Sequence, residues 1–584
     1  MRRLSIMDVQ GGAQPLWNED RSVAVLGNGE IYNAGALSER LLRSGHRLDN
    51  HSDMVVVPHL YEQLGAGAFE ALDGMFALVV IDLRRRLVLL ARDRMGEKPL
   101  SLFKTQTGLW FASEQRALLQ AGVVKPRLRA GSLPEYLMNG FSSEPLSMVE
   151  GIEKLPAGHL LMYDLTSGES RSRAYWSASK HLGDRRPSTD ELVEAISTSV
   201  ADSCHSDVPV GIALSGGLDS SIVATLAARS VPDLRCFTVG YEGAAASDET
   251  GLASEFATLL GLPITITRLA VSDVGREYAK LCSLRDEPIG DLAGPAYDAV
   301  AAAAREAGVP VLLTGQGGDE LFFGYPWIHE LARREMEQAE ATAEGRSVPH
   351  RWQPIPARLR DIPDWVTSRG GRQILGDLDE WHALHDTAEA RALPLFQFQR
   401  GYRQIRRLTL EVLGADIFDI PPDRFLTVGR GTHTAADYCL AVCDTYLRTN
   451  GLAQVDRLTM RHSVESRTPL VSRDLVEMVL AGLVGAIDLR NGPKEQLRLV
   501  AKQLLPPAVL ARPKRGFTPP MREWLRSIWQ QNSKELREPA LVDIGLISPD
   551  GFRTGIRHPV FRSGRVNQVA LRLATLEFWA RGVL

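Results

Sequence analysis

The fold is decided by the stretch Ser215-Gly216-Gly217-Leu218-Asp219-Ser220-Ser221, which stands between an apolar segment at 209–214 and a helical pattern at 220–229. Adjacent glycines let a backbone curve closely around an anion, and the unpaired N–H groups that begin the next helix point toward it. The serine hydroxyls can donate to phosphate oxygens, whereas the Asp219 carboxylate would repel phosphate and suits a bridging magnesium ion. Taken alone, the motif also fits an ordinary Gly-Ser turn with an aspartate near a helix cap.

A second loop of the same kind, Thr314-Gly315-Gln316-Gly317-Gly318-Asp319-Glu320, follows the apolar segment at 309–313. The carboxyl ends of parallel strands gather at one edge of a sheet, where ligands bind. We therefore expect the two loops to meet there, with Asp219 and Asp319 holding one magnesium ion between them. Neither loop has the Gly-Lys-Ser/Thr ending of a Walker-type loop.

Strand and helix patterns alternate around these loops, which indicates a parallel sheet. The expected strands are 209–214, 235–241, 264–268 and 309–314, and the expected helices are 189–204, 220–229, 249–260 and 295–308. This part of the chain is therefore predicted to be an α/β domain.

The front of the chain has short apolar runs that lie close together between Gly, Asn, Asp or Lys residues. They predict strands at 22–26, 76–81, 87–92, 109–112 and 159–163, with helices at 34–44 and 53–64. This pattern indicates a layered α+β domain. A charged linker at 183–188 follows, so we expect one domain over 1–180 and the α/β domain over 189–584.

Composition narrows the class of protein. With 584 residues the chain is too long for one core, and its 44% hydrophobic and 24% charged residues are ordinary for a soluble globular protein. A formal net charge of -4 argues against a nucleic-acid partner, and no run has the length of a membrane-spanning helix. The five cysteines are scattered, which fits a reduced cytoplasm. We expect a cytoplasmic protein whose partners are small molecules.

Taken together, these motifs resemble the glutamine-hydrolysing asparagine synthetase family. The two glycine loops match its signatures, and further matches run along nearly the whole chain: Arg3-Leu4-Ser5-Ile6-Met7-Asp8, Asn28-Gly29-Glu30-Ile31-Tyr32-Asn33, Ser52-Asp53, Asp456-Arg457-Leu458-Thr459-Met460, Glu465-Ser466-Arg467-Thr468-Pro469 and Lys494. The segments at 456–460 and 465–469 match the family's acidic-basic helix. The resemblance implies an Ntn-type glutaminase sandwich, incomplete at its start, followed by a PP-loop ATP pyrophosphatase domain with a helical C-terminal part.

The resemblance also implies a role for each site residue, with ATP and Mg²⁺ as cofactors and a homodimer as one assembly it allows. The implied ATP and pyrophosphate site consists of Ser215, Gly216, Gly217, Asp219, Ser220, Val239, Thr314, Gly315 and Gly317. The implied metal ligands are Asp219 and Asp319, and the implied catalytic residues are Lys494 and Gln316. The implied glutamine site consists of Arg3, Asn28, Gly29, Glu30 and Asp53. In the implied mechanism a carboxylate, aspartate in the main family, attacks the α-phosphorus of ATP. Ammonia then displaces AMP from the acyl-adenylate.

The sequence departs from the family at the glutaminase nucleophile. The family has a cysteine directly after the initiator Met, but no cysteine precedes Cys204 here. Either the reading frame begins further upstream, which the retained Asn28, Gly29, Glu30 and Asp53 favour, or the chain is short and uses free ammonia or another amine.

A second departure lies on the acceptor side, where Gln316 replaces the family's Glu and Ser472 replaces its Asp. Glutamine keeps a carbonyl acceptor but cannot take a full proton at neutral pH. Several hypotheses therefore stay open. An asparagine synthetase is the leading one, and a specialised amide synthetase that acts on another carboxylic acid is the alternative. A catalytically silent nucleotide-binding relative belongs to a different class, and so does a sulfurtransferase-type enzyme that adenylates nucleic acid, which the near-neutral charge disfavours.

Overall fold

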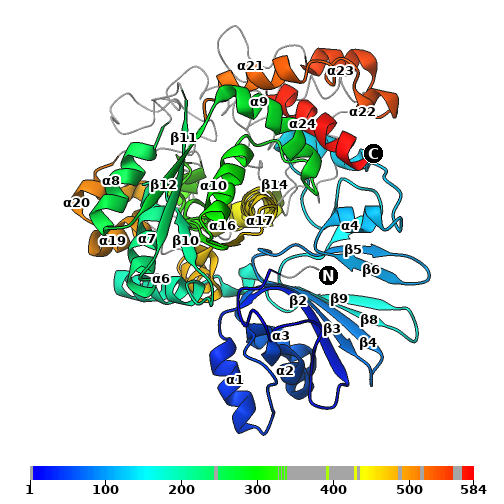
Figure 1. The fold of residues 1–584 in the computed structure, drawn as a ribbon, viewed down its shortest axis with the longest axis vertical. Coiled ribbons are helices and arrows are strands. Elements are labelled where there is room, and N and C mark those ends of the chain that lie inside the picture. The colour runs from blue at the N-terminus through cyan, green and yellow to red at the C-terminus, as the bar shows by residue number, and fades with distance from the viewer. Residues whose placement is uncertain are drawn as a thin grey trace, which may run out of the picture.

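Two halves with different sheets make up the structure, a computed structural model drawn in Figure 1. It describes residues 4–242, 248–326, 328–330, 332–333, 336–337, 390–392, 427–429, 434–484, 489–512, 519–556 and 568–584. Arg3, which the sequence assigns to the glutamine site, lies outside the described residues.

The front half is built on antiparallel strands. A six-stranded sheet has the order β1-β2-β3-β4-β8-β9, and a second sheet has the order β6-β5-β7. Their bounds are β1 Leu16–Trp17, β2 Val23–Ile31, β3 Gly74–Asp82, β4 Leu87–Arg92, β5 Ser101–Lys104, β6 Leu109–Ala112, β7 Ile152–Lys154, β8 His159–Asp164 and β9 Ser170–Ala174.

Strand β3 shows why this half is layered, because all of its central residues are apolar and successive side chains point to opposite faces. Ala77 and Val79 pack with Leu102 of the second sheet and with Leu100, which directly precedes β5. The alternate residues, Phe76, Leu78 and Val80, belong to the main core. Helices lie beside the six-stranded sheet, as Figure 1 shows: α1 (Ala34–Arg43), the 3₁₀ helix η1 (Asp53–Val55), α2 (Val56–Leu64) and α3 (Ala68–Ala71).

The back half contains the predicted parallel sheet, with strand order β12-β11-β10-β13-β16. The strands are β10 Val210–Ala213, β11 Arg235–Tyr241, β12 Ile264–Leu269, β13 Val311–Leu313 and β16 Glu465–Arg467. The helices that connect or flank them are α6 Thr189–Ser203, α7 Leu218–Ser230, α8 Thr250–Leu260, α9 Val271–Leu284 and α10 Gly294–Glu306. The fold class expected from the sequence, α/β plus α+β, is confirmed.

One expectation for this half is wrong. Residues 465–467, matched above to a helical segment, form strand β16, which pairs in parallel with β13 through Val311 and Glu465. The preceding helix ends at Met460, and Ser463 has a positive φ of 55° that turns the chain toward the sheet edge.

The C-terminal part is helical. Its helices are α16 Thr434–Val442, a π-helical stretch Cys443–Leu452, α17 Ala453–Met460, α18 Arg473–Leu480, α19 Glu495–Leu504, α20 Pro507–Leu510, α21 Met521–Gln531, α22 Ala540–Asp543, α23 Pro549–Ile556 and α24 Gln568–Val583. The remaining elements are α4 Gln115–Gln120, α5 Leu133–Asn139, α11 Gly318–Leu321, β14 Ala390–Ala392, β15 Thr427–Gly429 and the 3₁₀ turns Gly65–Gly67, Ala130–Ser132, Ala178–His181, Pro469–Val471 and Leu489–Asn491. None of the described helices has the length and apolarity needed to cross a membrane.

Helix α24 joins the two halves. The Tyr136 hydroxyl of α5 donates to the Arg572 carbonyl at 2.9 Å, and the Arg572 guanidinium donates to the Leu137 carbonyl at 2.6 Å. Both side chains are buried, so the C-terminal helix is part of the same core as the front half.

Candidate active site

The first glycine loop leaves the end of β10 and begins α7. Its serines bond to each other, because the Ser215 and Ser220 hydroxyl oxygens are 2.9 Å apart. Gly217 is the N-cap of α7, and its N–H donates to the Ser215 hydroxyl at 3.2 Å. Arg512 fixes the loop from outside by donating to the Gly216 carbonyl at 3.1 Å. The arrangement presents hydroxyls and the free N–H groups of a helix start at one place.

The second loop leaves β13 and lies directly against the first. Thr314 donates its N–H to the Arg467 carbonyl of β16 at 2.9 Å, and Gly317 is the N-cap of α11. A Cβ added at Gly318 would lie 2.7 Å from the Asp219 Cγ, and one at Gly315 would lie within 3.0 Å of the same residue's Cβ. The structure thus brings together the two loops that the sequence singled out.

Lys494 joins the carboxylates of the two loops. Its Nζ contacts Asp219 and lies 2.6 Å from an Asp319 carboxylate oxygen. The lysine caps α19 with a left-handed backbone, φ 58°, and its N–H donates to the Phe322 carbonyl at 3.0 Å. Burial lowers the pKa of Lys494, but the two carboxylates outweigh it and raise the pKa above its ordinary value. The side chain is therefore an ammonium ion held between two anions.

Gly324, which the sequence did not single out, makes this ion cluster possible. A Cβ at Gly324 would lie 1.8 Å from an Asp319 carboxylate oxygen and 2.3 Å from the Lys494 Cε. Nothing in the local sequence pattern marks this glycine, because the close approach involves a residue 170 positions further along the chain.

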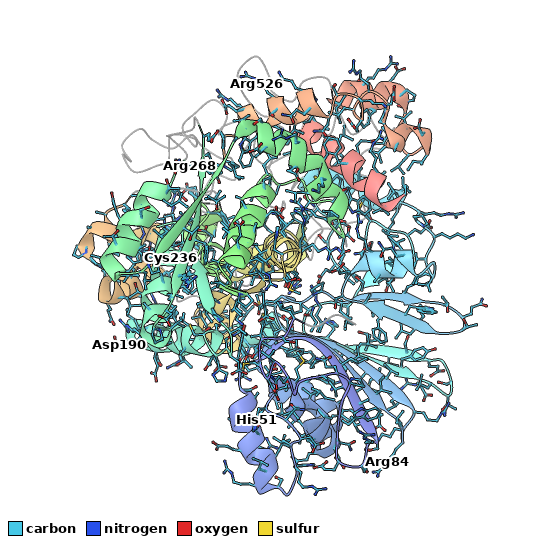
Figure 2. The ribbon with its side chains drawn as sticks, viewed as in Figure 1. His51, Arg84, Asp190, Cys236, Arg268 and Arg526 are labelled. Atoms are coloured by element: carbon cyan, nitrogen blue, oxygen red, sulfur yellow. The ribbon has the colours of Figure 1, made fainter. Side chains whose placement is uncertain are left out.

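The donor set of the cluster fits a magnesium ion. Mg²⁺ prefers oxygen ligands and binds through one or two carboxylates together with substrate phosphates. Asp219 and Asp319 supply two carboxylates from adjacent loops, and they already face a shared positive charge on Lys494. Val239, which the sequence assigns to the nucleotide site, is buried on β11, the strand that pairs with β10. Cys236 of the same strand is labelled in Figure 2.

The acceptor side of the site contains an amide and tyrosines. Gln316 donates its side-chain N–H to the Tyr297 hydroxyl at 2.9 Å. Glu320 accepts from the Tyr325 hydroxyl at 2.6 Å, and burial raises the pKa of Glu320 to about 7. Tyr297 and Tyr325 were not predicted, because a tyrosine in a helix or loop has no sequence signal that separates a site from a core. Ser472, the other departure noted above, is the N-cap of α18.

The residues assigned to the glutamine site gather in the front half. Asn28, Gly29 and Glu30 lie on β2, and Asp53 begins η1. The Ile31 N–H donates to Asp53 at 2.7 Å, but burial outweighs this bond and raises the pKa of Asp53 to about 6.

Buried contacts between acidic and basic side chains connect this group to the back half. Glu30 lies 3.1 Å from the Arg467 guanidinium, whose backbone carbonyl accepts from Thr314 in the second glycine loop. A second pair joins Lys98 to Asp456 at 2.8 Å. One residue of β16 therefore contacts both groups of site residues.

Two family models match this chain, one over each half. The family model described as asparagine synthase matches residues 191–581, and the model described as glutamine amidotransferase domain matches residues 1–176. The chain is 28% identical to asparagine synthetase [glutamine-hydrolyzing] 1 of Bacillus subtilis, over 90% of this chain and 80% of that protein. It is 34% identical to asparagine synthetase [glutamine-hydrolyzing] 2 of the same organism, over 56% of this chain and 46% of that protein.

A relative with a different description is amidase chry2 of Gibberella zeae, 26% identical over 93% of this chain and 84% of that protein. Among solved structures, the allosteric regulatory enzyme of purine biosynthesis is similar at a TM-score of 0.23 and 13% identity, covering 44% of this chain and 63% of that chain. That likeness is too distant to bear on function.

Proposed function

The chain belongs to the asparagine synthase family, and on this premise we propose that it adenylates a carboxylic acid with ATP and then transfers ammonia to the acyl group. It is a carbon–nitrogen ligase of the glutamine-hydrolysing asparagine synthase type. The observation that carries the proposal is the Lys494 ammonium between the carboxylates of Asp219 and Asp319, at the junction of two glycine loops.

In the first step a substrate carboxylate oxygen attacks the α-phosphorus of ATP, and the bond to the β-phosphate oxygen breaks to release pyrophosphate. Charge builds on the phosphate oxygens, and donors fixed in advance stabilise it most effectively. Ser215, Ser220 and the N-terminus of α7 supply hydroxyl and N–H donors, and Lys494 supplies a positive charge. Mg²⁺, held by Asp219 and Asp319, would neutralise charge on the leaving pyrophosphate.

In the second step ammonia attacks the acyl carbon, the bond to the AMP oxygen breaks, and the nitrogen loses a proton to the leaving AMP phosphate or to water. Gln316 can orient the attacking nitrogen through its carbonyl oxygen but cannot accept that proton. The ammonia would come from glutamine bound by Arg3, Asn28, Gly29, Glu30 and Asp53 or, because no cysteine precedes Cys204, from free ammonium.

Two carboxylic acids compete as the substrate. Aspartate, giving asparagine, is supported by the relatives described as asparagine synthetases. Another acid, in a specialised pathway, is supported by Gln316 and its bond to Tyr297, and by the amidase among the relatives.

Pyrophosphate release tests the proposal. We would measure it with ATP and Mg²⁺, comparing reactions with and without aspartate. Ammonium would be the nitrogen donor in one series and glutamine in a second. Aspartate-dependent release with asparagine formed would establish an asparagine synthetase. ATP binding without any dependence on aspartate would point to the other acid, and failure to bind ATP would reject the proposal.

A matched pair of variants distinguishes the effect of the Lys494 side chain from a general effect of changing a lysine on α19. Lys494→Ala should lower pyrophosphate release by about 100-fold, the size of effect that loss of one charge-stabilising group produces. Lys502→Ala, at the exposed end of the same helix, should leave the rate unchanged.

A further inference from the structure

A cluster of imidazole and carboxylate groups lies in the front half, apart from the residues assigned to substrates. It consists of Glu19, His46, His59 and Glu62, and we call it the histidine–glutamate cluster. One ligand atom from each residue lies within 4.8 Å of the other three. The cluster draws on three segments of chain: the turn after β1, the loop after α1 and helix α2, where His59 and Glu62 are spaced i, i+3 on one face.

Glu19 lies at the centre of the cluster. Its two carboxylate oxygens lie 2.9 Å from the His46 Nδ1 and 3.0 Å from the His59 Nδ1. The Arg47 N–H donates to the same carboxylate at 2.9 Å, and the Asn18 side chain donates to Glu62 at 3.1 Å. The imidazole ring centroids are 5.2 Å apart.

The protonation states suit metal binding. Burial alone would raise the pKa of Glu19, but the Arg47 N–H, further hydrogen bonds and the nearby imidazoles lower it to about 2, so the carboxylate is ionised. Burial lowers the pKa of His59 below its ordinary value, so its ring is neutral. Metal ions bind ionised carboxylates and neutral imidazoles.

The His59 ring is fixed through Nδ1 alone, the nitrogen that faces Glu19. The side chain is buried, and its Nε2 has no hydrogen-bond partner within the described part of the chain. A purely structural histidine in such a place would normally satisfy both ring nitrogens. If Nδ1 binds a metal ion, its proton moves to Nε2, so the binding leaves the ring neutral.

We propose that the histidine–glutamate cluster binds one divalent transition-metal ion, with two imidazoles and two carboxylates as ligands. Zn²⁺ fits this set best, because it takes four nitrogen and oxygen ligands at about 2.0–2.2 Å in a tetrahedron, which places neighbouring ligand atoms roughly 3.4 Å apart. The present separations bracket that spacing, so shifts of side chains close the site. Glu62 is exposed and Glu19 is partly exposed, which gives the ion a path from solvent.

The ion would hold the turn after β1 and the loop after α1 against α2. Because α2 directly follows the 3₁₀ helix that contains Asp53, the site would steady one end of the group assigned to glutamine. The proposal does not depend on that assignment, since the ligands are separate residues.

Zinc binding to the full chain tests the proposal without any activity assay. The protein would be stripped with a chelator, dialysed against micromolar ZnCl₂ and analysed for zinc per chain and for Tm. We expect about one bound ion and a rise in Tm of several degrees, because a ligand that binds only the folded state stabilises it. MgCl₂ should not bind at this cluster, because imidazole is a poor ligand for Mg²⁺, so any Tm shift that it causes through Asp219 and Asp319 should be the same in the cluster variants described below.

Matched variants locate the bound ion. Glu19→Gln and Glu62→Gln keep the shape of each side chain, and each should weaken zinc binding by about 100-fold or more and abolish the Tm shift. His51→Gln is the control, since His51 lies in the same half (Figure 2), is exposed and is not a member of the cluster. A wild-type chain that retains no zinc would overturn the proposal, and so would glutamine variants that retain as much as wild type. Glu62 is exposed, so its variant should fold even if Glu19→Gln does not.

Discussion

Lys494 illustrates what one residue can reveal in a sequence and what it cannot. The resemblance to a family predicts its catalytic role, which stays a prediction. Its left-handed backbone has no sequence signal, since a lysine there costs roughly 1 kcal/mol. The bond from its N–H to the Phe322 carbonyl and the two carboxylates at its ammonium offset that cost.

Gln316 allows a direct test of its role at the single-residue scale. In Gln316→Glu the carboxylate can accept from the Tyr297 hydroxyl, which only has to rotate its proton, so the position should be kept. We expect pyrophosphate release within about twofold of wild type and an amide-forming step changed by about tenfold or more, because a proton acceptor is gained. Rapid-quench measurement separates the two steps. Equal loss of both would show that position 316 has a different role.

Glu320 predicts a pH dependence of stability. Its pKa is about 7 in the folded protein against 4.5 ordinarily, so the folded state holds a proton that the unfolded state has released between these values. The contribution of the protonated Glu320 to the free energy of unfolding is roughly 3 kcal/mol. It is fully present below pH 4.5 and is lost as the pH rises through 7. Glu320→Gln should therefore stabilise the protein relative to wild type at pH 8 but not at pH 5, as measured by denaturant midpoints. The exposed Glu277→Gln should show no such difference.

At the scale of elements, the sequence predicted apolar strands well. The segments 87–92, 109–112 and 235–241 are strands β4, β6 and β11 with the same bounds, because turn-forming or charged residues flank each apolar run. The helical prediction for residues 465–467 was wrong, since two of the three residues of β16 are charged and the strand pairs with β13, which lies far away in the sequence. Helix α9 and strands β5, β7 and β9 were not predicted, because their polar residues weaken the periodic pattern.

The loop after α11 carries the next prediction. In Gly324→Ala the new methyl group would overlap with Asp319 and Lys494, so one of them must leave the ion cluster. We expect pyrophosphate release to fall by about 100-fold, with a loss of stability of about 1–3 kcal/mol from overpacking. The control is Gly251→Ala in α8, where a Cβ meets nothing within 4 Å. Wild-type rates in Gly324→Ala would contradict the geometry of the cluster.

At the scale of the whole molecule, the two glycine loops could be paired from the sequence because both follow strands of one parallel sheet. The contact between Glu30 and Arg467 could not, since 437 positions separate them and each reads locally as an ordinary charged residue. Burial of opposite charges costs desolvation, so a buried pair holds only when all of its partners are in place.

Arg467 satisfies that condition. It is fully buried, contacts Glu30 and Glu465, and donates to the carbonyls of Ser203 and His205 at 3.0 and 2.7 Å. These partners lie on β2, at the end of α6 and on β16 itself, so the side chain ties these three elements together. Because its carbonyl also accepts from the second glycine loop, a displaced β16 would disturb the synthetase site.

We therefore expect Arg467→Met to lower the free energy of unfolding by about 3 kcal/mol or more, since it leaves the buried Glu465 carboxylate without its cation and removes the partner of Glu30. It should also slow pyrophosphate release, through the shift of β16. Adding Glu30→Gln should change the stability little further, because burial raises the pKa of Glu30 to about 9 and its carboxyl group is already neutral near pH 7. Arg173→Met, which removes an exposed pair with Glu70, should cost less than about 1 kcal/mol. Equal losses in the two single variants, measured by denaturant unfolding, would mean that the Arg467 contacts do not hold the two halves together.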